Sequence, residues 1–378
     1  MFLVVATLYI HIPFCKSRCS YCDFYSGIQL SLMERLVDAL CLEIALRADY
    51  LKGETVETIY FGGGTPSLLT HEHFTRLFQS IQSQFDINDS KEITLEANPD
   101  DLSDDYLEML SLLPFNRISI GLQSLDDTEL SLLRRRHSAS QAIDAVRKSQ
   151  RYFSNVSIDL MYGLPAQTIF TWEHTISAAL ALNVQHVSAY HLTYENGTLL
   201  ERKRREGKVV PVSEETSVEM FRILCDRLLE KGIEQYEISN FSLSGYRSKH
   251  NSSYWHGVNY LGIGPSAHSF DGDSRQWNVA DIVSYVEGIE KNRMSLEKEQ
   301  LTTIDKYNEC IMTLLRTVEG ISLDFVEQKF GSNRKVFLLR QAARFIHTNL
   351  LCNVNGFLKF TPDGFFVSDG IITDLMAD

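Results

Sequence analysis

The sequence predicts an α/β protein: a partial (β/α)6-type TIM barrel followed by a small C-terminal domain of helices and a β-wing. Short runs rich in β-branched and aromatic residues alternate with segments whose apolar residues recur at helical spacing. The runs are apolar along most of their length, as parallel strands buried on both faces are. Because no run carries the marks of an exposed sheet edge, a barrel is favoured over an open sheet.

Strand–helix units in series predict parallel strands with the helices outside them. The expected strands are residues 8–12, 58–63, 92–98, 117–123, 156–163 and 186–192, with a weaker seventh at 235–241. Apolar periodicity predicts helices over residues 31–51, 132–153 and 172–182. The apolar start, MFLVVATLYIHIPF, is expected to be a buried strand rather than a signal peptide, because it has no basic region and no small-residue cleavage site.

The chain divides into three expected regions. Residues 1–245 form the barrel core, and residues 246–299 form a connecting region; the stretch 244–270, rich in glycine, serine and aromatic residues, is expected to be structured loop. Residues 300–378 form the C-terminal domain, with two helical stretches and then a hairpin that turns at the sequence PDG.

Composition limits the class of function. The chain has 378 residues, 44% of them hydrophobic, and a net charge of −13, which argues against nucleic-acid binding through phosphates. No stretch is long and apolar enough to span a bilayer, so no transmembrane segment is expected. The seven cysteines are an odd number and only three of them cluster, which favours a metal site in the reducing cytoplasm over a disulfide framework.

The three clustered cysteines follow the first expected strand as C-x3-C-x2-C, at Cys15, Cys19 and Cys22. Thiolates at this spacing can close around soft metal. A structural zinc ion needs a fourth ligand, for which His11 or Asp23 is available, and three packed core cysteines are the metal-free alternative. A [4Fe–4S] cluster on three thiolates leaves one iron open to a small molecule.

Marked residues follow other strands at the same end of the expected barrel. They are the glycine loop GGGTPS (62–67), whose N–H groups could face an anion, and Glu96, Gln123, Arg135 and Asp159. Ligands of parallel barrels bind at the C-terminal ends of the strands. Carboxylates there can hold ribose hydroxyls, and an arginine can pair with a ligand carboxylate.

These motifs resemble those of the radical S-adenosylmethionine (SAM) superfamily. YIHIPFC, FGGGTPS, IGLQS, SIDLMYGLP and YLGIGPSAHSF together resemble its oxygen-independent coproporphyrinogen III oxidase-like branch, over about residues 8–370, with a HemN-like C-terminal domain. The resemblance implies a [4Fe–4S] cluster on Cys15, Cys19 and Cys22, whose open iron SAM chelates, and an electron donor for one-electron cleavage of SAM. The SAM contacts it implies are Tyr9, Tyr21, Gly63, Gly64, Thr65, Glu96, Gln123, Arg135 and Asp159.

Two departures separate this chain from the decarboxylating oxidases of that branch. The oxidases typically continue the motif to a further cysteine where this chain has Phe24, and they carry a substantial N-terminal extension where this chain has eight residues before Tyr9. Both departures resemble the HemW-like heme chaperones, as does the sequence HNSSYW. The heme contacts implied are His250, Asn251, Tyr254 and Trp255, with His256 and His268 as nearby competitors.

The function expected is therefore that of a heme chaperone carrying a [4Fe–4S] cluster and SAM. The alternative is an oxygen-independent coproporphyrinogen III dehydrogenase. A SAM-dependent tRNA-modifying enzyme and a structural zinc protein are weaker readings, because the chain is acidic and an obvious fourth ligand is missing. The expected partners are heme, an acceptor apoprotein such as a respiratory one, an electron donor and, peripherally, a membrane surface.

Overall fold

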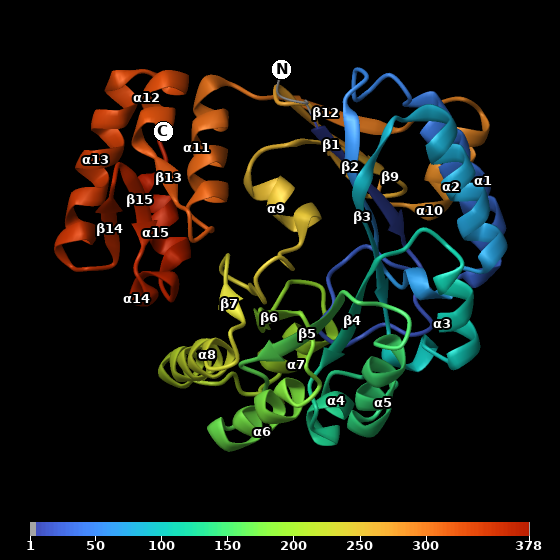
Figure 1. Ribbon diagram of the computed structural model, residues 1–378, viewed down its shortest axis with the longest axis horizontal. Helices are drawn as coiled ribbons and strands as arrows, with labels where there is room; N and C mark the ends of the chain where they lie inside the picture. Colours follow the sequence, from blue (N-terminus) through green and yellow to red (C-terminus); the bar gives the residue numbers. More distant parts are fainter. Residues whose placement is uncertain (1–4, 378) are drawn as a thin grey trace.

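The computed structural model describes residues 5–377, apart from the side chain of Ser90 (Figure 1). The opening residues MFLV, expected to begin the first strand, lie outside the described residues. No helix within the described chain is both long enough and apolar enough to cross a membrane.

One twelve-stranded sheet forms the frame, in the order β12-β11-β10-β9-β1-β2-β3-β4-β5-β6-β8-β7. Its strands β1 to β6 run parallel to one another, as six of the expected strands required. They are β1 (Val5–Ile12), β2 (Thr55–Gly63), β3 (Ile87–Ala97), β4 (Arg117–Gln123), β5 (Val156–Tyr162) and β6 (His186–His191). Their inward and outward residues are largely buried, which confirms the partial barrel.

Helices cover the outside of these strands (Figure 1). They are α1 (Met33–Leu46), α2 (His71–Gln84), α3 (Asp104–Ser111), α4 (Asp127–Leu132), α5 (Ala139–Ser149), α6 (Ile169–Leu180), α7 (Leu199–Arg205) and α8 (Glu214–Leu229). Short 3₁₀ turns, η1 (Leu30–Leu32), η2 (Pro66–Leu68) and η3 (Pro99–Asp101), lie before α1, α2 and α3.

The single helix expected over 132–153 is wrong, because the chain turns between α4 and α5. Arg134 adopts a positive φ of 57°, which ends the first helix. Ser138 then caps the second, accepting from the Gln141 N–H while the Gln141 side chain accepts from the Ser138 N–H. The turn places Arg135 beside the strand ends.

The weak seventh strand is also wrong as one parallel strand. It is two short antiparallel strands, β7 (Glu234–Gln235) and β8 (Asn240–Ser242). The Glu237 carboxylate accepts from the Ser239 N–H at 2.8 Å and from Asn240 Nδ2 at 2.5 Å, which closes a turn between them.

The connecting region is helix and sheet, and its first part, residues 244–270, is not the structured loop that was expected. It contains α9 (Lys249–Trp255), β9 (Asn259–Ile263), β10 (His268–Phe270), β11 (Ser274–Asn278), α10 (Ile282–Glu290) and β12 (Leu296–Gln300). β9 pairs in parallel with β1, and β10 to β12 follow antiparallel. The sheet therefore ends in two edges, β12 and β7, so the expectation of no edge was wrong although the barrel remains partial.

The C-terminal elements are helices around a small sheet, as expected. They are α11 (Thr303–Leu314), β13 (Ile321–Ser322), α12 (Leu323–Phe330), α13 (Ser332–His347), β14 (Leu351–Val354), β15 (Phe357–Phe360), α14 (Pro362–Phe365) and α15 (Ser368–Leu375). The hairpin turns at Asn355 and Gly356, both with positive φ, and not at PDG, which begins α14. Figure 1 shows this domain beside α9, away from α1 and α2.

Candidate functional site

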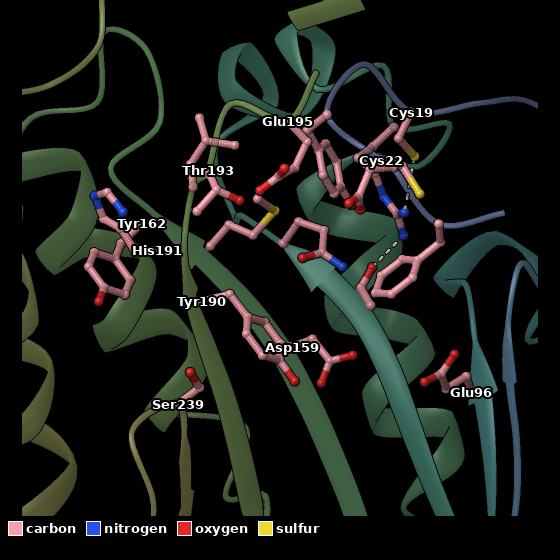
Figure 2. A pocket seen from close by; sticks show the side chains of 18 of the residues that line it. Cys19, Cys22, Glu96, Asp159, Tyr162, Tyr190, His191, Thr193, Glu195 and Ser239 are labelled. Atoms are coloured by element: carbon pink, nitrogen blue, oxygen red, sulfur yellow. Dashed lines mark hydrogen bonds between the residues drawn. The ribbon is translucent and has the colours of Figure 1, made fainter. Parts of the chain in front are cut away.

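A cavity of about 1090 Å³ opens at the C-terminal ends of the parallel strands. This volume is at the upper end of small-molecule sites, which span roughly 300–1,000 Å³. Loops after β1 to β6 form most of its wall, and residues 365–370 of the C-terminal domain close one side. In Figure 2, Cys19 and Cys22 lie on one side, His191 and Tyr162 on the other, and Asp159 and Tyr190 between them.

All three motif cysteines line this cavity. Backbone hydrogen bonds fasten their loop: Cys15 N–H donates to Gly27 O at 2.9 Å, and Ser20 N–H donates to Leu133 O at 3.0 Å. The loop is therefore held at both ends against the barrel, and its thiols face the same space as the strand ends.

A chain of side-chain hydrogen bonds joins two of the thiols. Thr65 Oγ1 donates to Cys15 Sγ at 3.4 Å and accepts from Asn98 Nδ2 at 3.1 Å. Asn98 Oδ1 accepts from Arg135 Nη2 at 2.6 Å, and Arg135 Nη1 donates to Cys19 Sγ at 3.5 Å. Donors to sulfur fit thiolate ligands, because they stabilise negative charge on the sulfur. Sequence reasoning missed Asn98, although it follows Glu96 at the end of β3.

The surroundings of Cys22 disfavour the ionised, thiolate form of its free side chain. Burial raises its pKa to about 11, and the neighbouring Cys19 and Cys15 add to the rise, whereas the Phe24 backbone N–H opposes it. Thiols must lose their protons to bind metal, so loading this site releases protons.

The geometry gives no support to a single zinc ion. Within residues 5–377, no three His, Cys, Asp or Glu side chains gather closely enough to hold one metal ion. His11, a proposed fourth ligand, has both ring nitrogens engaged, Nδ1 with Tyr9 Oη at 3.0 Å and Nε2 with Tyr25 O at 3.0 Å. Three thiols around a shared cavity fit a larger cluster better than one ion.

The glycine loop does not offer its N–H groups to an anion. The Gly63 N–H donates to Glu96 Oε2 at 3.1 Å, and the Gly64 N–H donates to Ile12 O at 2.9 Å. Its glycines are required by packing, since a Cβ on Gly63 would lie 2.4 Å from the His11 ring. Gly63, Gly64 and Thr65 nevertheless line the cavity, as expected of ligand contacts.

Two half-buried carboxyls and a strained glutamine line the floor of the cavity. Burial raises the pKa of Glu96 to about 7 and the Asp159 charge adds to the rise, while the Tyr60 hydroxyl, 2.7 Å from Oε1, lowers it. Burial also raises the pKa of Asp159, opposed by the Ser188 and Ser119 hydroxyls. Gln123 ends β4 with a φ of 68°, a conformation that non-glycine residues adopt at a cost and often at functional sites.

Arg135 lies in the cavity wall but is largely committed to the protein. Besides Asn98 and Cys19, it donates from Nη2 to Gly121 O at 2.5 Å. Its Nε is buried with no partner among the described residues. Bidentate pairing with a ligand carboxylate, as expected from the sequence, would compete with these bonds.

The two tyrosines among the expected SAM contacts differ in position. Tyr21 lines the cavity, whereas Tyr9 does not. The Tyr9 ring stacks near Tyr60, 6.2 Å between centroids, and its hydroxyl bonds His11. Tyr9 thus supports the wall from behind in this structure.

The HNSSYW residues lie outside the cavity lining. His250 is buried, with Nδ1 2.6 Å from Thr58 Oγ1 and Nε2 3.0 Å from Tyr254 Oη, and its ring stacks on Tyr60. Burial lowers the His250 pKa to about 3. Both ring nitrogens of His250 are therefore engaged within the protein. The Asn251 N–H donates to the Ser248 hydroxyl, which caps the start of α9.

Trp255, the last residue of the motif, lies closer to the cavity. Its Nε1 is buried with no partner in the described chain, and the Arg316 guanidinium stacks on its ring at 5.0 Å. Of the competing histidines, His256 bonds Ser252 O through Nδ1, and His268 stacks on Trp277.

Besides Asn98, sequence reasoning missed His191 and Arg316, which also line the cavity. His191 ends β6, with Nε2 3.0 Å from Ser217 Oγ, and its position followed the same strand-end rule that marked Asp159. Arg316 comes from the C-terminal domain, and no local pattern marks it.

The fold and this cavity define a radical SAM protein. The Radical SAM superfamily profile matches residues 9–179, and the HemN C-terminal domain profile matches residues 301–367. The chain is 32% identical to the Heme chaperone HemW of Lactococcus lactis over 98% of this chain and 97% of that one. It is 35% identical to that of Bacillus subtilis over 85% and 86%. The chain belongs to the HemW family of the radical SAM superfamily.

A solved structure shares the whole architecture. Coproporphyrinogen III oxidase (HemN) from Escherichia coli, described as a radical SAM enzyme, superposes with a TM-score of 0.85 over 98% of this chain and 90% of that one. Its sequence identity is 22%, so this likeness concerns the fold.

Proposed function

We propose that this protein is a cytoplasmic heme chaperone, which binds heme and transfers it to an acceptor apoprotein. The observation that supports this most is a cavity with three thiols on one side and, on the other, an apolar wall that includes Phe221 and Phe366. A tetrapyrrole is a large, flat, mostly apolar ligand, which such a wall suits. Full-length relatives named Heme chaperone HemW support the same function.

A [4Fe–4S] cluster and SAM belong to this proposal as resident cofactors. Cys15, Cys19 and Cys22 would hold the cluster, and Thr65 and Arg135 would donate to its sulfur ligands. The cluster supplies one-electron chemistry to SAM when an external donor reduces it.

The SAM subsite would lie between the thiols and the carboxyls. Glu96 and Asp159 are half-buried acceptors suited to hydroxyl groups, and Gln123 lines the same space. Gly63, Gly64 and Tyr21 would form its walls.

Two histidines, His250 and His191, are candidates for the ligand of the heme iron. Ligation through His250 requires the loss of its bond to Thr58 or to Tyr254. His191 lies in the cavity already, and its Nδ1 makes no bond to the described residues. Asn251, Tyr254 and Trp255 would act by holding the helix that carries His250.

Heme titration tests the proposal. The anaerobically reconstituted protein is mixed with heme and the Soret band is followed, and then a heme-free globin is added. A stoichiometric Soret shift followed by transfer to the globin supports the chaperone. Absence of any saturable shift contradicts it.

The alternative is coproporphyrinogen III oxidation, supported by the shared fold with the Escherichia coli enzyme. Phe24 counts against it, since its exposed ring lies in the cavity where the oxidases typically carry a further cysteine.

A further inference from the structure

One partly buried arginine of the cavity wall, Arg316, lacks a hydrogen-bonding partner among the described residues, whereas Arg18 and Arg134, which also line the cavity without a side-chain hydrogen bond, are exposed. The Arg316 guanidinium donates no hydrogen bond to the residues that the structure describes, and its Nε is buried. By contrast, Arg135 is bonded to Asn98 and Gly121, and Arg136 is ion-paired with Asp100 at 2.5 Å. Arg316 is therefore a half-buried cation with free donors.

The backbone fixes where Arg316 stands. Ile238 N–H donates to Arg316 O at 3.1 Å, Val318 N–H donates to Tyr236 O at 3.1 Å, and Glu237 bridges Thr317 in antiparallel pairing. Ile238 and its neighbour Ser239 both line the cavity. Figure 2 shows Ser239 on the side away from Cys19 and Cys22.

Two neighbours orient the guanidinium without satisfying it. The Arg316 Cζ lies 5.0 Å from the centroid of the Trp255 ring, a cation–π contact that uses none of the N–H donors. Glu237 is near enough for the Arg316 charge to lower its pKa against the rise caused by burial, but the two make no ion pair within 4.0 Å. Glu237 Oε2 and Arg316 Nε are both left without a hydrogen bond.

We propose that Arg316 binds a carboxylate of the tetrapyrrole, one of the two propionates of heme, at the end of the cavity far from the cysteines. A planar guanidinium with free edges suits a carboxylate, which it can bind bidentately. The same contact links the cavity to the HNSSYW helix through Trp255. This inference rests on the proposed heme-binding function and adds that the protein recognises the propionate side chains of heme.

Removal of the charge from the ligand tests it. The full-length reconstituted protein is titrated with iron(III) protoporphyrin IX and, separately, with its dimethyl ester, both from the same detergent micelles. The wild type should bind the diacid at least about tenfold more tightly than the ester, the range expected for a charged hydrogen bond. Arg316→Gln should lose that preference with ester affinity unchanged, and Arg316→Lys should keep part of it.

Arg247→Gln is the matched control. Arg247 also connects the core to the C-terminal domain, through Glu319, and also stacks on an aromatic ring, that of Tyr236, but it does not line the cavity. It should keep the wild-type preference, and unfolding midpoints check that every variant is folded.

The outcomes separate the two proposals. A wild type that binds neither ligand overturns the chaperone function and this inference together. A wild type that binds both ligands equally, or an Arg316→Gln variant that keeps the preference, overturns this inference alone, and Arg316 is then a counter-ion of Glu237.

Discussion

The side-chain oxygen of Asn98 accepts a hydrogen bond of 2.6 Å from Arg135 Nη2. This bond joins the end of β3 to the turn after α4, and it completes the connection from Cys15 through Thr65 to Cys19. The side-chain amide of Asn98 thus links the two donors to thiols, Thr65 for Cys15 and Arg135 for Cys19. Because outer contacts of this kind set ligand orientation and basicity, the amide should matter to cluster binding.

Asn98→Ala should lower the iron content of the reconstituted protein. Loss of outer contacts typically costs about 10–100-fold in metal affinity, because the ligands lose orientation. Iron and acid-labile sulfide per chain measure the effect during chelator competition. Asn116→Ala is the control, since Asn116 is exposed, bonds Ile93 and Lys91, and lies outside the cavity. If both variants resist the chelator equally, Asn98 does not support cluster binding.

Cys15→Ala should abolish the cluster, because two thiolates cannot replace three. Cys41→Ala should leave iron and sulfide unchanged, since Cys41 is a half-buried thiol on α1 whose pKa burial raises. The broad visible absorption of the reconstituted protein reports both variants. Full cluster absorption in Cys15→Ala would contradict the assignment of the motif.

Glu96 should make the protein less stable as pH rises toward neutrality. Its pKa is about 7 in the folded protein against 4.5 in a free side chain. Between these values the folded state holds the proton more tightly, so raising the pH favours the unfolded chain. Buried His11 and His250, with lowered pKa values, act in the opposite direction.

The Glu96→Gln variant separates these effects. The free energy of unfolding of the wild type, minus that of the variant, should fall from pH 4.5 to pH 7 and level off above. Denaturant melts across this range measure it. A difference that is constant with pH would mean that Glu96 ionises normally.

His250→Ala should destabilise the fold whatever its role toward heme. The variant loses two buried hydrogen bonds, to Thr58 and Tyr254, and the stacking on Tyr60, so roughly 2–4 kcal/mol of stability should be lost. Thermal melts of the apoprotein measure this loss.

His191→Ala distinguishes the two candidate iron ligands. His191 lies at the cavity surface with one hydrogen bond, to Ser217, so its removal should change stability little. The variant whose Soret band moves away from the wild-type position identifies the histidine that ligates the heme iron. Unchanged heme spectra in the His250→Ala protein, once shown to be folded, would refute ligation through His250.

Much of the fold was predictable because buried parallel strands leave a strong local pattern. The prediction for β4, residues 117–123, matches its observed bounds, since its apolar run has clear polar ends. The predicted strand at 235–241 failed because the side chain of Glu237 closes a turn that apolar patterning does not register. The strands after residue 255 were missed because their sequence, rich in glycine, serine and aromatic residues up to Phe270, lacks a clear apolar run, and β9 is ordered by its pairing with β1.

The site residues likewise divide into those that a local sequence pattern marks and those that only tertiary pairing brings to the cavity. The cysteines, Glu96, Gln123 and Asp159 could be placed in one cavity because parallel strands end together. Asn98 and His191 obeyed that rule but were not marked. Arg316 had no local signal, because only the pairing of its segment with residues 236–238 brings it to the cavity.

We infer that this radical SAM protein carries heme rather than oxidising a porphyrinogen. A parallel assay of one reconstituted preparation tests it most directly, with heme uptake followed by Soret absorption and coproporphyrinogen III turnover followed with SAM and reductant. We expect stoichiometric heme uptake and no protoporphyrinogen. Robust formation of protoporphyrinogen, with no saturable heme uptake, would contradict it.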